Sequence, residues 1–281
     1  MRRSRPRRGP GAISLVLDTC RKEKRSAFIP FLVAGDPHLD RTPELLAALV
    51  RGGSDIIELG VPFSDPMADG PTNQRGYHRA LEAGTTLGKI LDLVKRHRDA
   101  LGVPIVLFTY CNPIFRRGLE RFAEEAASAG VDGVLFVDLP PEESENEVTP
   151  VLQSHGIDQV FLLAPTSTTE RIRKAARLSS GFLYYVSRTG VTGEQDQLAT
   201  DLTSELRSVR RKVKLPLAVG FGISTPEQVA SVAGAADAVV VGSHLVSLVA
   251  EHVDEPDVCQ RLEERVRELT EPLRAKSTRK R

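Results

Sequence analysis

The chain reads Asp55-Ile-Ile-Glu-Leu-Gly-Val-Pro-Phe-Ser-Asp-Pro-Met-Ala-Asp-Gly-Pro71 where a short apolar run gives way to a loop rich in proline, glycine and aspartate. The apolar part is typical of a buried strand. One carboxylate, Glu58, lies inside it, and Asp65 and Asp69 follow in the loop. A buried carboxylate is costly unless it is paired or put to use. The stretch therefore predicts either a structural ion pair at Glu58 or an acid that takes part in catalysis.

The same alternation of apolar strand and helix recurs along the chain. Strands are predicted at 27–34, 54–61, 105–110, 133–139, 159–164, 182–187, 217–221 and 238–241. A helix is predicted to begin at Thr42 and Pro43, as N-cap and first helical residue. Further helices are predicted near 86–100, 119–129, 142–155, 168–179, 196–211 and 225–233, before a closing helix with one apolar face. Ser167-x-x-Glu170 and Ser224-x-x-Glu227 indicate capping boxes at two helix starts.

Strands this uniformly apolar indicate a parallel sheet that is covered on both sides. A doubly wound open sheet remains open as an alternative, but eight regular repeats favour a single-domain α/β fold, the (β/α)8 TIM barrel. Helical spacing predicts an extra helix in front of it, with an apolar face of Ile13, Val16, Leu17 and Cys20. We find no linker, and expect one barrel domain over 12–275 between basic, disordered tails at 1–11 and 276–281.

Composition excludes several classes of protein. The 281 residues are 41% hydrophobic and 27% charged with a net charge of +1, so no overall field draws the chain to nucleic acid or membrane. No apolar run approaches the length of a transmembrane helix. Three widely spaced cysteines make neither a disulfide framework nor a CxxC metal site. We expect a cytoplasmic protein without a metal or cofactor.

Candidate catalytic groups lie where a barrel places them, at the carboxyl ends of strands. Glu58 is near the end of the second strand and Asp69 is on the following loop, while Tyr110 and Tyr184 belong to two other strands. Apolar surroundings predict a raised pKa for Glu58. Asp69, on a polar loop, is predicted to stay ionised. Two carboxylates in unlike environments can divide acid and base roles.

Two glycine segments suggest a phosphate site. Gly220-Phe-Gly-Ile-Ser224 follows the seventh strand and Gly242-Ser-His244 follows the eighth. Glycines let backbone N–H groups approach an anion, and a helix N-terminus adds a favourable dipole. The alternative is that these glycines only make tight turns. Gly190-Val-Thr-Gly193, in one of the two longest loops, could close over the same group.

The stretch from Glu58 to Thr72 resembles the signature of the tryptophan synthase alpha chain family. The resemblance runs from about Ala27 to the closing helix. It includes Phe28-x-Pro-Phe31, Gly35-Asp-Pro37, Tyr110-x-Asn-Pro113, Val137-Asp-Leu-Pro-x-Glu-Glu143, Ser187-Arg-Thr-Gly-Val-Thr-Gly193 and Gly220-Phe-Gly-Ile-Ser224.

The resemblance implies a lyase that performs retro-aldol cleavage of indole-3-glycerol phosphate to indole and glyceraldehyde 3-phosphate in L-tryptophan biosynthesis. The family's catalytic carboxylates match Glu58 and Asp69. Its substrate-binding positions match Phe31, Tyr110, Tyr184, Gly193, Phe221, Gly222, Gly242 and Ser243. The chemistry requires a base for the side-chain hydroxyl and an acid for the indole ring carbon.

The resemblance also implies a partner, a beta chain that carries pyridoxal phosphate, in an alpha2-beta2 tetramer. Asp65, at the outer bend of the loop, matches a position that faces this partner; the alternative is that it only caps its own turn. Asn73 departs from the family pattern, which implies an aliphatic residue there, and Cys111 stands where tyrosine or alanine is expected.

Two other functions remain open from the sequence. One is a stand-alone indole-3-glycerol phosphate lyase of secondary metabolism. The other is a non-catalytic barrel that activates a beta chain, although the presence of both carboxylates and both glycine segments argues against it.

Overall fold

The structure is a computed structural model that describes residues 11–186, 195–220 and 222–274. Of the two expected tails, only Gly11 lies within these ranges, directly before the first helix. No helix in this part of the chain is long and apolar enough to span a membrane.

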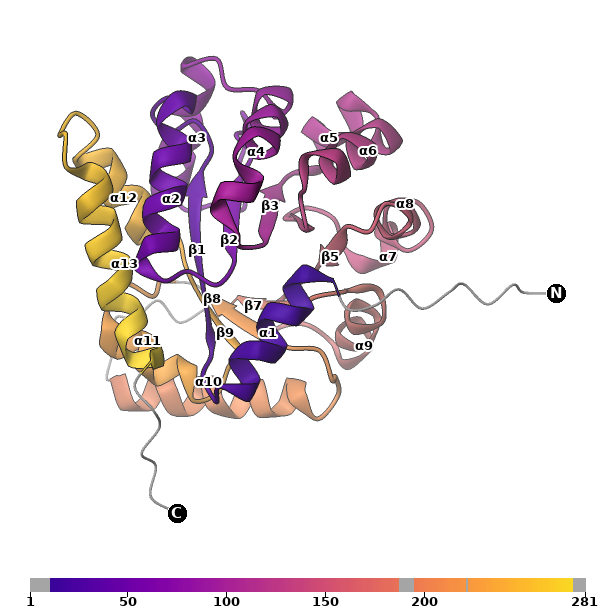
Figure 1. Cartoon of the computed structure of the whole chain (residues 1–281). Coiled ribbons are helices and arrows are strands. Elements are labelled where there is room, and N and C mark those ends of the chain that lie inside the picture. Colours follow the sequence, from indigo (N-terminus) through magenta and orange to yellow (C-terminus); the bar gives the residue numbers. More distant parts are fainter. Residues whose placement is uncertain (1–10, 187–194, 221, 275–281) are drawn as a thin grey trace.

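Nine parallel strands form one nearly closed barrel, surrounded by helices (Figure 1). They are β1 (Ala27–Val33), β2 (Ile57–Gly60), β3 (Ile105–Thr109), β4 (Gly133–Phe136), β5 (Asp158–Val160), β6 (Leu162–Leu163), β7 (Leu183–Val186), β8 (Leu217–Gly220) and β9 (Ala238–Val241). Pairing runs from β5 through β4, β3, β2, β1, β9, β8 and β7 to β6. The predicted barrel is confirmed. Its fifth strand is divided at Phe161, where pairing passes from β4 to β7.

The helices are α1 (Ala12–Lys22), α2 (Thr42–Gly52), α3 (Pro71–Glu82), α4 (Leu87–Leu101), α5 (Cys111–Arg117), α6 (Leu119–Ala129), α7 (Pro141–Ser144), α8 (Val148–Ser154), α9 (Thr169–Leu178), α10 (Gln195–Arg210), α11 (Pro226–Ala233), α12 (Ser243–Glu251) and α13 (Val258–Arg274), with a 3-10 turn at Leu39–Arg41. The expected first and closing helices are present as α1 and α13. Three helices, α3, α5 and α12, were not predicted, and the helix expected over 142–155 is two short ones.

Helix α1 closes the amino end of the barrel. Its buried residues Ile13, Leu17 and Cys20 join the side chains inside the strand ring in one apolar cluster. The approach is close: a Cβ on Gly133, the first residue of β4, would lie 2.8 Å from Ile13 Cδ1. Because this end is filled, a cavity can open only at the carboxyl end, where sequence reasoning placed the site.

Two helix caps lie one residue later than predicted. Thr168, not Ser167, caps α9 by accepting a hydrogen bond from the N–H of Arg171. Thr225 and Gln228 form the capping box of α11. Ser167 instead accepts a hydrogen bond from the N–H of Ala164 at 3.0 Å, which stabilises the loop before α9.

An ion pair anchors α3, the helix that follows the loop after β2. Arg79 donates two hydrogen bonds, both of 2.7 Å, to the buried carboxylate of Asp36 in the loop after β1. Bidentate pairs of this kind fix geometry as well as adding energy. The ion pair therefore joins α3 to the neighbouring loop at the carboxyl end of the barrel.

Candidate active site

Strand β2 places Glu58 inside the barrel with almost no access to solvent. Glu58 pairs in register with Phe31 of β1 and Val106 of β3, and only 1% of its surface is exposed. Its Oε1 has no hydrogen-bond partner among the described residues. Burial raises the pKa of Glu58 to about 8, because a low-dielectric site disfavours the charged form. The described residues therefore provide no ion-pair partner for Glu58, which was the alternative interpretation. The raised pKa of Glu58 agrees with the prediction.

Asp69 lies on the loop after β2 and is held through both carboxylate oxygens. The hydroxyl of Tyr110 donates to Oδ2 at 2.6 Å, and the amide of Asn73 donates to Oδ1 at 3.2 Å. The surroundings are less polar than the sequence suggests. Burial raises the pKa of Asp69, whereas the hydrogen bonds from Tyr110 and Asn73 lower it.

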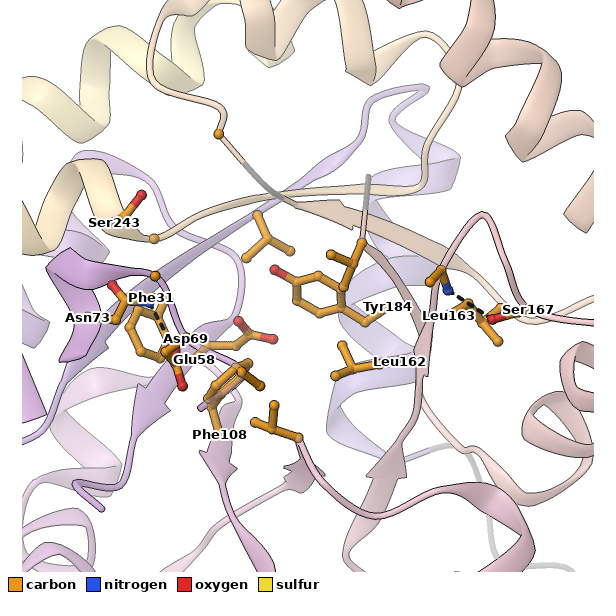
Figure 2. A pocket seen from close by; sticks show the side chains of 18 of the residues that line it. Phe31, Glu58, Asp69, Asn73, Phe108, Leu162, Leu163, Ser167, Tyr184 and Ser243 are labelled. Carbon is orange, nitrogen blue, oxygen red and sulfur yellow. Dashed lines mark hydrogen bonds between the residues drawn. The ribbon is translucent and has the colours of Figure 1, made fainter. Parts of the chain in front are cut away.

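Both acids face one cavity of about 920 Å³ at the carboxyl end of the barrel. Figure 2 shows Glu58 and Asp69 near Phe31 and Phe108, with Tyr184 on the facing side. The two phenylalanines form an edge-to-face pair with ring centroids 5.2 Å apart. A largely apolar pocket with a few converging polar groups is typical of a small-molecule site. We call the part of the cavity around Glu58 and Asp69 the acid end.

A second part of the cavity wall, which we call the glycine end, consists of Gly222, Gly242 and Ser243. Gly222 follows β8 with φ +70°, a conformation that favours glycine. Gly242 is the N-cap residue of α12, and exposed Ser243 is its first residue. The first N–H groups of a helix have no intrahelical acceptor and can bind an anion.

Arg265 of α13 links the first turn of α12 to the loop after β8, next to the glycine end. It donates to Nε2 of His244 at 2.8 Å and to the backbone oxygen of Ser224 at 2.7 Å. Burial lowers the pKa of His244, and the nearby Arg265 lowers it further. The neutral form, which can accept this hydrogen bond, is therefore favoured.

A second close approach ties β7 to β8. A Cβ on Gly220, the last residue of β8, would lie 2.2 Å from the hydroxyl oxygen of Tyr184. Only glycine therefore leaves room for the Tyr184 ring in the cavity wall.

The structure brings most of the predicted site residues together. Phe31, Glu58, Asp69, Tyr184, Gly222, Gly242 and Ser243 all line the cavity. Tyr110 lies behind Asp69 and binds its carboxylate. Gly193 and Phe221 lie outside the described residues, so their expected roles stay predictions.

Asp65 does not line the cavity. It is exposed on the loop after β2, where the Ser64 hydroxyl donates to its carboxylate at 2.5 Å. Of the two departures from the family pattern, Asn73 contacts Asp69, whereas Cys111 opens α5 and donates its backbone N–H to Asp138 at 2.8 Å.

Sequence reasoning missed several residues of the cavity wall, among them Phe108, Leu162 and Asn73 as a partner of Asp69. Phe108 carried a weak signal, because it lies in a predicted strand directly before Tyr110. Nothing in the local sequence pairs Asn73 with Asp69, apart from their spacing of four residues. In the described part of the chain, no group of three or more His, Cys, Asp or Glu residues is placed to hold a metal ion.

Comparison with known proteins gives one family. The model of the family described as tryptophan synthase alpha chain matches residues 17–274. The tryptophan synthase alpha chain of Solibacter usitatus is 50% identical over 257 residues, which cover 92% of this chain and 96% of the relative. That of Geobacter sulfurreducens is 56% identical over 224 residues, covering 80% and 84%.

Solved structures agree. The tryptophan synthase alpha subunit from Legionella pneumophila str. Paris superposes with a TM-score of 0.88 at 36% identity, covering 94% of this chain and 99% of that one. A tryptophan synthase structure from Mycobacterium tuberculosis superposes with a TM-score of 0.84 at 36% identity, covering 95% and 99%.

Proposed function

Because this chain belongs to the tryptophan synthase alpha chain family, we propose that Glu58 and Asp69 carry the chemistry of that family here. The chain is a lyase of L-tryptophan biosynthesis that cleaves indole-3-glycerol phosphate to indole and glyceraldehyde 3-phosphate. In this retro-aldol reaction a proton leaves the side-chain hydroxyl and another is added to the indole ring carbon. The carbon–carbon bond between them breaks, and its electron pair restores the aromatic ring.

Glu58 is the proposed proton shuttle. Its raised pKa keeps it protonated near neutral pH, so it can give its proton to the ring carbon and then accept the hydroxyl proton as a carboxylate. A group whose pKa lies near the working pH serves both directions of transfer. Burial in the barrel, without a competing partner for Oε1 among the described residues, leaves that oxygen available to substrate.

Asp69 has a different role in the proposal. When the ring carbon is protonated, positive charge develops on the indole ring, and a carboxylate next to the ring N–H stabilises it. Tyr110 and Asn73 fix this carboxylate before substrate arrives. Preorganised charge of this kind requires no rearrangement during the reaction.

The remaining wall binds the rest of the substrate. We assign the indole ring to the aromatic surfaces of Phe31 and Tyr184, and the phosphate to Gly222, Gly242 and Ser243 at the glycine end. The N-terminus of α12 supports this assignment, because its free N–H groups favour an anion.

The observation that carries the proposal is a fully buried, unpaired carboxylate oxygen facing the same cavity as a second, doubly hydrogen-bonded carboxylate. The test is indole release from indole-3-glycerol phosphate by the purified chain, with Asp69→Asn alongside. We expect wild type to release indole and Asp69→Asn to lose most of the rate. Absence of indole with and without a beta chain would leave only the role of a non-catalytic activator.

The partner proposal is that the chain works in the cytoplasm with a tryptophan synthase beta chain as an alpha2-beta2 tetramer, and that Asp65 lies in the contact. Exposure of Asp65 away from the cavity supports this role. Titrating indole release with a beta chain should show activation in wild type and much less in Asp65→Ala, at similar basal rates. Equal activation would mean that Asp65 serves only its own turn, with Ser64. No activation of wild type would favour the stand-alone lyase.

A further inference from the structure

Asn73 occupies the position on α3 where an aliphatic residue was expected, and its amide reaches the proposed catalytic carboxylate. Nδ2 of Asn73 donates to Oδ1 of Asp69 at 3.2 Å. Tyr110, from the end of β3, donates to the other oxygen at 2.6 Å. The two donors come from different elements, so together they fix both the position and the rotation of the carboxylate.

We propose that Asn73 is a positioning residue for Asp69: its amide holds one oxygen of the ionised carboxylate while Tyr110 holds the other. The inference rests on the proposed function, which makes Asp69 the group that stabilises charge on the indole ring. It adds a residue that acts through Asp69 and sets the pH range in which Asp69 works.

The electrostatic surroundings show why an amide donor matters here. The titratable groups that interact electrostatically with Asp69 are Tyr77 of α3, Tyr110 and Tyr184. The other ionisable residues that line the cavity are Glu58, Glu142, Glu170 and Arg171. No cation of the described residues contributes to the pKa of Asp69, so hydrogen bonds alone offset the cost of burying its charge. Removing one of two such donors shifts the balance toward the protonated form.

The orientation of the amide follows from its partner. An ionised carboxylate accepts hydrogen bonds only, so Nδ2 rather than Oδ1 of Asn73 must face Asp69. This leaves Oδ1 of Asn73 buried without a partner among the described residues. An unpaired buried acceptor is unfavourable for folding, and an aliphatic residue would avoid that cost. The amide is therefore better explained by its contact with Asp69 than by packing.

The next residue of α3 provides a matched control. Gln74 donates to the backbone oxygen of Asp69 at 2.8 Å, and to that of Pro66 at 3.4 Å. Gln74 thus holds the main chain of the loop, whereas Asn73 holds the carboxylate. Loss of Gln74 should disturb the loop without removing a donor from the Asp69 side chain.

The experiment compares the pH profile of kcat for indole release in wild type, Asn73→Leu and Gln74→Leu, with Asn73→Ala in reserve if the leucine variant does not fold. Loss of the Asn73 donor raises the pKa of Asp69, so the ionised form appears only at higher pH. We expect the acid limb of Asn73→Leu to move up by about half to one pH unit, with little change in KM. Gln74→Leu should lower kcat without moving the limb.

Two outcomes separate the inference from the function on which it rests. If Asp69→Asn keeps the wild-type rate, the proposed role of Asp69 is wrong. If Asp69→Asn is inactive while the Asn73 variants show the wild-type acid limb, Asp69 is catalytic and only the positioning role of Asn73 is refuted. An equal shift in Asn73→Leu and Gln74→Leu would also refute it, because the loop rather than the amide would then be responsible.

Discussion

The acid end of the cavity contains two carboxylates, whereas the glycine end consists of two glycines and the first residue of α12. Glu58 is 1% exposed and has a raised pKa. Ser243, at the glycine end, is exposed. Proton transfer near neutral pH requires a carboxylate whose pKa is shifted by burial, while anion binding requires free N–H groups that a ligand can reach.

The difference predicts how each end fails. Substitutions at the acid end should remove the chemistry and leave binding and the fold nearly intact. Substitutions at the glycine end should weaken binding and leave the rate at saturation nearly intact. Four experiments test this division, from the largest expected effect to the smallest.

Glu58→Gln should lower kcat by roughly 10²- to 10⁴-fold, the usual contribution of general acid–base catalysis. Glutamine has nearly the same shape but cannot exchange a proton. The measurement is steady-state indole release, with urea unfolding to show that the variant is folded. A wild-type kcat in this variant would show that Glu58 is not part of the mechanism, and the proposed division between the two ends of the cavity would be wrong.

Ser243→Asp should raise KM by roughly 10- to 100-fold, because a carboxylate at the first residue of α12 would face the substrate phosphate with like charge. The effect on kcat should be small. Ser247→Asp, one turn further along α12 and outside the cavity wall, is the matched control and should leave KM unchanged. Equal KM changes in the two variants would place the phosphate elsewhere.

The pH dependence of stability should differ between wild type and Glu58→Gln. The pKa of Glu58 rises from 4.5 to about 8 on folding, so the folded chain binds this proton more tightly than the unfolded chain. This contribution to stability is complete below pH 4.5 and is lost as the pH rises toward 8, at roughly 1.4 kcal/mol per pH unit. We therefore expect the free energy of unfolding of Glu58→Gln, relative to that of wild type, to increase from pH 5 through pH 6.5 to pH 8. Parallel curves would show that Glu58 titrates normally.

Arg265→Ala should raise KM by only about 3- to 10-fold, the cost of losing one or two hydrogen bonds that link α12 to the loop after β8. The control is Arg267→Ala on the same helix. Arg267 forms an exposed ion pair with Glu263 and should affect neither kinetic constant. A loss of kcat without a change in KM in Arg265→Ala would contradict the division between the two ends.

The sequence predicted most of the barrel because its strands are short apolar runs. The three missed helices each lack a usual signal. In α3 only Gly76, Tyr77 and Ala80 are buried, so its apolar stripe is narrow. Helix α5 contains Pro113, and α12 is separated from β9 by Gly242 alone and has similarly apolar residues. Local periodicity cannot separate such segments from the strands and loops around them.

The site was predictable where the sequence neighbours of a residue indicate whether it is buried in the fold. An acid inside an apolar strand indicates a raised pKa, and Glu58 has one. The environment of Asp69 depends on Tyr110, 41 positions away in the chain. The local sequence therefore predicted a polar loop, although the folded loop lies against the barrel mouth and buries much of Asp69.

The contact between Gly220 and Tyr184 limits how this protein can evolve. Every substitution of Gly220 adds a Cβ, and this atom would lie 2.2 Å from the hydroxyl oxygen of Tyr184. A second mutation that shortens the side chain at position 184 would relieve this clash, but it would remove the aromatic surface assigned to the indole ring, and the new Cβ would still lie 3.0 Å from Val240 Cβ. Positions 184 and 220 therefore form a coupled pair, and we expect tyrosine and glycine to be retained there together.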